Sequence, residues 1–116
     1  MSLKEKILIA DDSEMNQMLL EEILSDKYEY VMAKDGTEAV DILEKNDDID
    51  LVMLDINMPK IDGFGVLEIM NLRHWISEVP VIIISSESDV DFIRRGYDLG
   101  ASDYISRPFD LTVVRR

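Results

Sequence analysis

The sequence predicts a single α/β domain in which five parallel strands alternate with five helices, a (βα)5 unit with a doubly wound sheet. Short apolar runs suited to buried strands alternate along the chain with segments whose apolar residues recur at helical spacing. Capping and turn residues stand at the junctions between them. The length of 116 residues suits one ordinary core. We therefore expect right-handed crossovers that place helices on both faces of the sheet.

The first strand-helix unit begins with an apolar run, residues 6–10, that ends at Asp11 and Asp12. Ser13 can cap the following helix, because its hydroxyl can accept a hydrogen bond from a free backbone N–H. Apolar residues at helical spacing predict the buried side of this helix: Met15, Met18, Leu19 and Ile23. The polar residues between them are expected to face solvent: Glu14, Gln17, Glu21 and Glu22.

In the second unit, the sequence gives a weaker signal for the strand than for the helix. Residues 28–33 are aromatic and β-branched, but their charged flanks favour a strand at the edge of the sheet. Asp35 opens a capping-box-like pattern with Glu38, which predicts the start of a helix. The inner stripe of this helix is expected to hold Ala39, Val40 and Leu43.

The third unit contains the most informative stretch of the chain. Residues 51–54 are apolar and stop at Asp55, which predicts a strand buried on both faces with a carboxylate at its carboxyl end. Loop-forming residues follow, among them Asn57 and Pro59, whose ring fixes its own φ. A helix is expected over residues 63–72, with these residues facing inward: Val66, Ile69 and Met70.

The last two units complete the pattern. Residues 81–84 form a fourth buried run that ends at Ser85 and Ser86, and a helix over residues 89–99 is expected to carry Val90, Ile93 and Tyr97 on one side. Residues 103–106 fit a fifth short strand. Residues 111–116 provide little more than one turn of a last helix, whereas an isolated helix below about 12 residues is marginal in water. We therefore expect this helix to be truncated, and residues 1–116 to be an N-terminal fragment of a longer protein.

Composition excludes several classes of function. The formal net charge of -13 argues against direct binding of nucleic acid or an anionic membrane, since both are bound chiefly through Lys and Arg. The chain has no cysteine, so it has neither a disulfide framework nor a thiolate metal site. It shows no apolar run long enough to span a membrane and no secretory signal at its N-terminus. We therefore expect a soluble, cytoplasmic protein.

Polar residues follow four of the five expected strands, namely Asp11 with Asp12, Asp55, Ser85 and Arg107. In the flavodoxin-like strand order 2-1-3-4-5, the first and third strands are neighbours, and their carboxyl ends flank the usual binding crevice. Three carboxylates would then share one pocket with a hydroxyl and a cation. Such groups suit Mg²⁺ and a phosphoryl group, and they allow Asp55 to act as a nucleophile toward phosphorus.

At these residues the chain resembles the receiver domain of two-component response regulators, a CheY-like fold. The resemblance is carried by four motifs in order: Asp11-Asp12, the stretch LDINMPKIDG at residues 54–63, Ser85-Ser86, and GASDYISRPF at residues 100–109. It covers the chain up to the truncated helix. It implies a phosphorelay receiver, in which a sensor histidine kinase or a phosphotransfer protein donates a phosphoryl group.

The resemblance also assigns roles to individual residues. Asp55 would be the phosphoacceptor, and Mg²⁺ would be bound by Asp12, Asp55 and the backbone carbonyl of Asn57, with Asp11 acting through metal-bound water. Ser85 would contact the phosphoryl group and Tyr104 would act with it as a switch. Two further positions of the family tune the lifetime of the phosphoryl group, and they correspond here to Asn57 and Glu87, a pair that implies rapid self-dephosphorylation.

One position departs from the family pattern. Arg107 stands where the family nearly always has Lys, and a planar guanidinium can grip a carboxylate in a way that a compact ammonium cannot. This substitution motivates an alternative, an unphosphorylated pseudo-receiver that serves only as an interaction module. Two other classes are disfavoured. An aspartyl phosphatase would need an acid at Asn57, and a flavodoxin would have its FMN phosphate repelled by the clustered acids.

The resemblance predicts how the signal leaves the domain. Phosphorylation would change the face formed by the fourth helix, the fifth strand and the fifth helix, and that face would bind a partner, a second copy in a homodimer, or a C-terminal output domain. The domain would catalyse its own phosphorylation and dephosphorylation without being a conventional enzyme. The Arg-Pro-Phe variant followed by VVRR at residues 113–116 is similar to receivers fused to cyclic-dinucleotide cyclase or HD-type phosphohydrolase domains.

Overall fold

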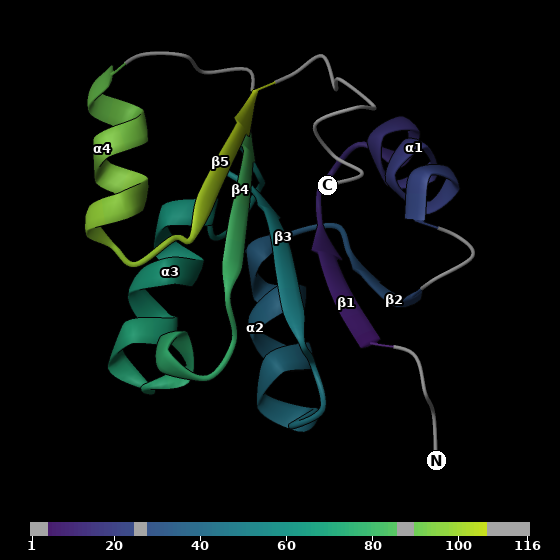
Figure 1. Ribbon diagram of the computed structural model, residues 1–116, viewed down its shortest axis with the longest axis horizontal. Helices are drawn as coiled ribbons and strands as arrows, with labels where there is room; N and C mark the ends of the chain where they lie inside the picture. The colour runs from purple at the N-terminus through teal and green to yellow at the C-terminus, as the bar shows by residue number, and fades with distance from the viewer. Residues whose placement is uncertain (1–4, 25–27, 86–89, 107–116) are drawn as a thin grey trace.

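The computed structural model describes residues 5–24, 28–85 and 90–106 (Figure 1). Its elements in chain order are β1 (Glu5–Ala10), α1 (Glu14–Leu24), β2 (Tyr28–Ala33), α2 (Gly36–Lys45), β3 (Leu51–Asp55), α3 (Gly63–Leu72), the 3₁₀ helix η1 (Trp75–Ser77), β4 (Val81–Ser85), α4 (Val90–Asp98) and β5 (Asp103–Ser106). The expected last helix lies outside the described residues. Within them, no helix combines the length and the hydrophobicity needed to span a membrane.

The strands form one parallel sheet in the order β2-β1-β3-β4-β5. The predicted order and the predicted edge position of β2 are therefore confirmed. The register pairs Ala10 of β1 with Leu54 of β3, and it pairs Asp55 with Ile84 of β4. Because parallel strands end at the same edge of a sheet, Asp11, Asp55 and Ser85 follow one another across that edge.

Alternating side chains of the strands pack on opposite faces of the sheet. On one face, Leu8 and Ala10 of β1 belong to a large buried cluster with residues of α2 and α3, against which Phe92 of α4 also packs. On the other face, Ile7 and Ile9 join a smaller cluster with Leu20 of α1. Figure 1 shows α2 and α3 on the side of the sheet opposite α1. The fold is thus doubly wound, as predicted.

Two aspartates cap the helices that cover the larger cluster. The carboxylate of Asp35 accepts a hydrogen bond from the Glu38 N–H at 2.8 Å, and that of Asp62 accepts one from the Gly65 N–H at 2.8 Å. The expected inner residues Ala39 and Leu43 of α2, and Val66 and Met70 of α3, are buried. Val40 and Ile69 are half-buried. The capping prediction for α2 and the periodicity predictions for both helices are confirmed.

The orientation of α1 corrects the sequence prediction. Met15, Met18 and Leu19, which were expected to be buried, are exposed, with fractional exposures of 78%, 69% and 36%. Leu20 is fully buried instead. The expected solvent-facing residue Gln17 is half-buried, and its side-chain amide donates hydrogen bonds to two backbone carbonyls at the ends of β1 and β2. A backbone carbonyl in a buried segment needs a partner, and the Gln17 amide supplies one to Asp11, so this polar side chain faces the sheet and the methionines face outward.

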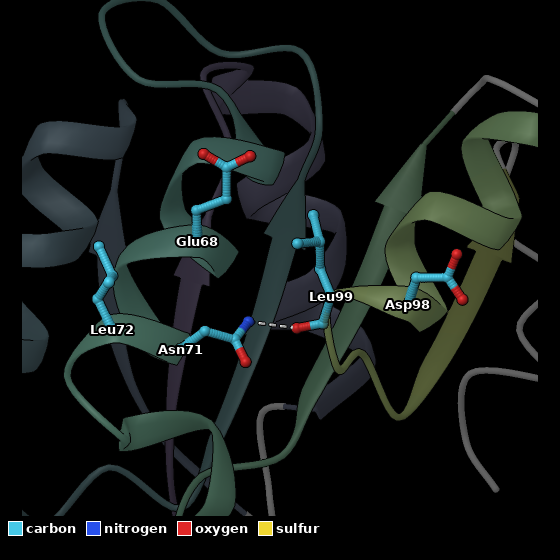
Figure 2. Close-up of a pocket in the computed structure, with 5 residues that line it drawn as sticks. All are labelled: Glu68, Asn71, Leu72, Asp98 and Leu99. Atoms are coloured by element: carbon cyan, nitrogen blue, oxygen red, sulfur yellow. Dashed lines mark hydrogen bonds between the residues drawn. The ribbon is translucent and has the colours of Figure 1, made fainter.

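Helices α3 and α4 meet at their C-terminal ends, where a groove opens between them (Figure 2). The side-chain amide of Asn71 donates to the Leu67 carbonyl at 2.9 Å and to the Leu99 carbonyl at 2.6 Å, which ties the two ends together. Along α4, Gly96 is buried close to the sheet, whereas Val90 and Tyr97 are exposed. Since helices run antiparallel to the strands they follow, this groove lies at the amino ends of the strands.

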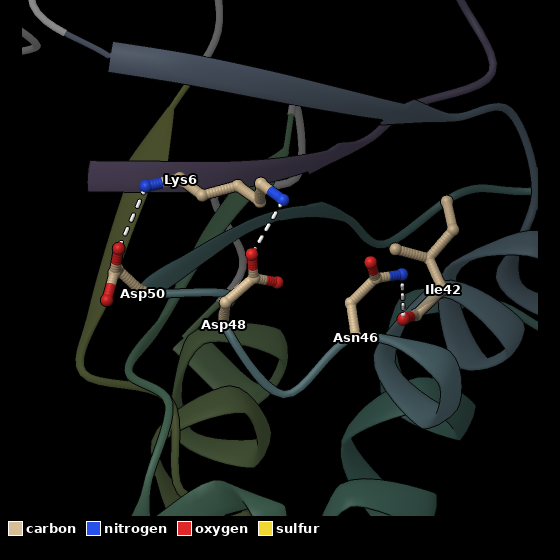
Figure 3. A network of polar contacts seen from close by, with 5 residues as sticks. All are labelled: Lys6, Ile42, Asn46, Asp48 and Asp50. Carbon is tan, nitrogen blue, oxygen red and sulfur yellow. Dashed lines mark hydrogen bonds and ion pairs between the residues drawn. The ribbon is translucent and has the colours of Figure 1, made fainter. Parts of the chain in front are cut away.

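A polar network fastens β1 to the segment between α2 and β3 (Figure 3). The backbone N–H of Lys6 donates to the Asp50 carboxylate at 2.8 Å, and its ammonium donates to the Asp48 carboxylate at 2.8 Å. The hydrogen bond from Lys6 lowers the pKa of the Asp48 carboxyl, and the same bond raises the pKa of Lys6. Asn46 caps α2 by donating to the Ile42 carbonyl. The network thus sets where β3 begins.

The orientation of α1 predicts which side chains hold it in place. Leu20→Ala should lower the free energy of unfolding by about 2–5 kcal/mol, because it removes a fully buried side chain. Met15→Ala, the matched control on the exposed side, should change it by no more than about 0.5 kcal/mol. Urea unfolding of both variants measures the difference. Equal losses for the two would contradict this orientation.

The pair formed by Lys6 and Asp48 predicts a pH-dependent contribution to stability. The folded-state pKa of Asp48 is depressed, so its contribution is present above the unfolded value of about 3.9 and is lost as pH falls through the folded value. The raised pKa of Lys6 means that the pair persists up to about pH 10. Asp48→Asn should therefore lower stability at about pH 6, with a gap that closes below about pH 4. A gap that stayed constant in urea unfolding across this range would contradict the assignment.

Candidate functional site

Three carboxylates converge at the carboxyl edge of the sheet, as predicted. Asp11 and Asp12 follow β1 and Asp55 ends β3, and a carboxylate oxygen from each lies within 4.8 Å of the others. Asp11 and Asp55 are buried, with fractional exposures of 1% and 2%, whereas Asp12 is exposed. The cluster therefore has a buried floor and one side open to solvent.

The chain between β1 and α1 fixes Asp11 through its backbone and its side chain. The Asp11 N–H donates to the Ala33 carbonyl of β2 at 2.9 Å, and the Asp11 carboxylate accepts a hydrogen bond from the Ser13 N–H at 2.9 Å. Gln17 of α1 donates to the Asp11 carbonyl at 2.6 Å. This role of Gln17 was not predicted from the sequence, because a glutamine between exposed acids carries no signal that separates it from a surface residue.

The loop between β3 and α3 fixes Asp55. The Asn57 N–H donates to the Asp55 carboxylate at 3.3 Å, and the Gly63 N–H donates to the Ile56 carbonyl at 2.8 Å, which closes the loop at its base. Gly63 is buried, and a Cβ atom at this position would collide with the backbone carbonyl of Asp55. A glycine is therefore required for the helix to start this close to the carboxylate.

Ser85 and Tyr104 lie on the neighbouring strands. Ser85 ends β4 one residue beyond the partner of Asp55 and is fully buried. Tyr104 of β5 is half-buried and packs against the larger core cluster. Its N–H donates to the Asp103 carboxylate at 2.8 Å. The structure therefore brings the predicted hydroxyl to the same edge as the carboxylates. The predicted site residues Glu87 and Arg107 lie outside the described residues.

The electrostatics of this cluster suit a divalent cation. Two unit charges about 4 Å apart repel by about 1 kcal/mol in bulk water and by several times more at the effective dielectric of a protein surface. A bound cation removes this repulsion. Carboxylate and carbonyl oxygens are the ligands that Mg²⁺ takes, with water completing its octahedron, and the solvent-facing side at Asp12 leaves room for water. The residues present therefore fit Mg²⁺.

Fold and site together define a receiver domain, and comparison with known proteins assigns the family. The chain belongs to the receiver domains of two-component response regulators, since the family model for the response regulator receiver domain matches residues 7–116. The resemblance carried by the four sequence motifs is thereby confirmed.

Individual relatives agree with this assignment. A protein of Porphyridium aerugineum named "Probable transcriptional regulator ycf27" is 43% identical over 107 residues, which cover 91% of this chain and 43% of the relative. The transcriptional regulatory protein CpxR of Escherichia coli K12 is 35% identical over 105 residues, 90% of this chain and 43% of CpxR. The solved structure of the chemotaxis response regulator CheY4 of Vibrio cholerae superposes with a TM-score of 0.87 at 26% identity, covering 96% of this chain and 92% of CheY4. The chain thus spans less than half the length of these curated relatives.

The clustered charges predict a stabilising substitution. Asp12→Asn should raise the free energy of unfolding in EDTA by about 1 kcal/mol, because it removes one repelling charge at an exposed position without opening a cavity. Urea unfolding at low ionic strength measures the gain, which should shrink in high salt. The exposed Glu14→Gln is the control for loss of one negative charge elsewhere. A destabilised Asp12→Asn protein would contradict the proposed repulsion.

Proposed function

We propose that this domain is a phosphorelay receiver in which Asp55 takes a phosphoryl group from the phosphohistidine of a histidine kinase or phosphotransfer protein. The observation that carries this proposal is the convergence of Asp11, Asp12 and Asp55 within 4.8 Å at the carboxyl edge of the sheet. A buried carboxylate held beside two others has the arrangement that phosphoryl transfer needs, since positioning and charge neutralisation are most of the catalysis.

Mg²⁺ is the cofactor that this proposal requires. Asp12, Asp55 and the backbone carbonyl of Asn57 would hold it, and Asp11 would act through metal-bound water. When bound, Mg²⁺ neutralises charge on the carboxylates and on the phosphoryl oxygens. The hydrogen bonds that the Asp11 and Asp55 carboxylates accept from Ser13 and Asn57 support this assignment, because they fix both groups before a metal arrives.

The chemical step uses the Asp55 carboxylate as the nucleophile. One carboxylate oxygen forms a bond to phosphorus while the bond between phosphorus and the imidazole nitrogen of the donor breaks. The imidazole leaves with that electron pair, and the product is an aspartyl phosphate. The buried hydroxyl of Ser85 lies at the same edge and would donate a hydrogen bond to a phosphoryl oxygen. Arg107, next in the chain after β5, would supply a cation to the same group.

The response would pass from Ser85 to Tyr104 and then to the face formed by α4, β5 and the expected last helix. Ser85 and Tyr104 lie on adjacent strands, β4 and β5. Tyr104 also lies beside Gly96 of α4, where a Cβ atom would be 3.6 Å from the tyrosine ring. A change in the position of Ser85 could thus bias a pre-existing two-state arrangement of this face, which would bind a second copy, another partner or an output domain.

The partner that donates the phosphoryl group would approach over α1. Met15 and Met18 are strongly exposed there, and α1 starts two residues after Asp12. An exposed apolar patch beside a reactive group marks an interaction surface. We place this exchange in the cytoplasm, where a histidine kinase presents its phosphohistidine.

The lengths and names of the relatives indicate what the whole protein controls. Relatives that are twice as long as this chain are named as transcriptional regulators. We therefore propose that residues 1–116 form the N-terminal receiver of a longer regulator that controls transcription, in preference to the cyclase or phosphohydrolase output suggested by the Arg-Pro-Phe variant. DNA binding would belong to the output domain, since the receiver itself carries a net charge of -13.

Phosphorylation can be tested by intact-protein mass after incubation with Mg²⁺ and a small acyl phosphate. The parent should gain one phosphoryl group, and Asp55→Asn should gain none, because the nucleophile is removed. Omitting Mg²⁺ or adding EDTA should abolish the gain in the parent. An unmodified parent with Mg²⁺ demonstrably bound would overturn the proposal and favour the pseudo-receiver, with Arg107→Lys as the next variant to test.

The lifetime of the phosphoryl group tests the roles proposed for Asn57 and Glu87. We expect self-dephosphorylation within minutes, because an amide and an acid at these positions resemble the pair found in the chemotaxis receivers of this family. The measurement follows the loss of the phosphoryl mass after the donor is removed, with Mg²⁺ present. A half-life of many hours would show that these residues do not set a short lifetime.

A further inference from the structure

The loop that connects β3 to α3 rests on the first turn of α2. Gly36 is the first residue of α2 and is buried. A Cβ atom at this position would collide with the backbone carbonyl oxygen of Ile61 and would lie 2.6 Å from the Ile61 Cβ atom. The loop backbone therefore occupies the space into which a side chain at residue 36 would extend, so α2 limits how closely the loop can approach it.

The same loop carries Asn57 only four residues before Ile61. Its base is closed by the hydrogen bond from the Gly63 N–H to the Ile56 carbonyl at 2.8 Å. Asp62 anchors its far end by capping α3. With both ends fixed, displacement of Ile61 must be absorbed within the few residues that include Asn57.

An ion pair adds a second, weaker connection between α2 and the loop. The ammonium of Lys60 lies 3.6 Å from the Asp35 carboxylate. The Lys60 side chain is 68% exposed, and an ion pair of this kind contributes at most about 1 kcal/mol. Asp35 also caps α2, so its carboxylate is already oriented. The backbone contact at Gly36 is therefore the stronger of the two constraints.

We propose that Gly36 is a positioning residue for the metal site. Because it has no side chain, the loop can pack directly on α2, and this packing sets the position from which the Asn57 carbonyl would bind Mg²⁺. This inference rests on the proposed function. Mg²⁺ demands nearly ideal octahedral geometry, so a small displacement of one ligand lowers its affinity. Residues that hold metal ligands in position without being ligands themselves typically contribute 10–100-fold to metal affinity.

The test compares Gly36→Ala with a matched control, Gly65→Ala. A Cβ atom at Gly65 would also lie 2.6 Å from Ile61, but from the Cγ2 methyl group of its side chain and not from its backbone. Titration calorimetry with Mg²⁺ alone gives the affinity, and thermal melting in EDTA gives the stability. Gly36→Ala should bind Mg²⁺ about tenfold more weakly or worse, while Gly65→Ala stays within about twofold of the parent.

Equal Mg²⁺ affinity in the parent and in Gly36→Ala would overturn the inference, and so would an equal loss in the two alanine variants. A lower melting temperature of Gly36→Ala with unchanged affinity would mean a purely structural role and would also overturn it. A parent that bound no Mg²⁺ would instead remove the proposed function on which the inference rests.

A second variant covers the case in which Gly36→Ala does not fold. Ile61→Gly introduces no clash, but it removes the Cβ atom above Gly36 and frees the loop backbone at an incompletely buried position. It should lower Mg²⁺ affinity by about tenfold. A folded Ile61→Gly protein that bound Mg²⁺ within about twofold of the parent would overturn the inference.

Discussion

The mutual repulsion of three carboxylates, held together where β1 and β3 end, is the constraint on which the rest of this structure depends. Asp11 and Asp55 are almost completely buried, and water cannot screen them as it would on an exposed surface. The parallel sheet imposes this proximity, because the register that pairs Ala10 with Leu54 sets Asp11 and Asp55 side by side.

Several features of the fold hold that arrangement in place. Backbone N–H groups of Ser13 and Asn57 point at the carboxylates, and Gly63 lets α3 begin directly against the backbone of Asp55. The strands that carry the acids are buried on both faces, so they cannot separate to relieve the repulsion without exposing core residues such as Leu8 and Leu54. A bound divalent cation would lower this repulsion, and under the proposed function it would also neutralise charge during phosphoryl transfer to Asp55.

Much of this could be predicted from the sequence because the signals were strong and local. Buried runs that stop at carboxylates defined β1 and β3, and the edge position of β2 followed from its charged flanks. The clustering of Asp11, Asp12 and Asp55 followed from strand order alone, since the carboxyl ends of adjacent parallel strands always meet.

The features that could not be predicted depend on contacts between distant segments. Apolar spacing placed Met15 and Met18 inside, but the amide of Gln17 occupies that side of α1, where it donates to the Asp11 carbonyl at 2.6 Å. Lys60 has a left-handed backbone with φ of +69°, and the presence of a lysine does not predict this conformation. The contact between Gly36 and the loop joins residues far apart in the chain, and no periodicity reports such a contact.

The most direct test of the account is anomalous X-ray diffraction from crystals of the parent protein grown with Mn²⁺, a metal with oxygen ligands like those of Mg²⁺. We expect an anomalous peak within coordination distance of the carboxylates of Asp12 and Asp55 and of the Asn57 carbonyl. A cluster that remained without a peak while Mn²⁺ bound elsewhere, or a guanidinium in place of the metal between the carboxylates, would contradict it.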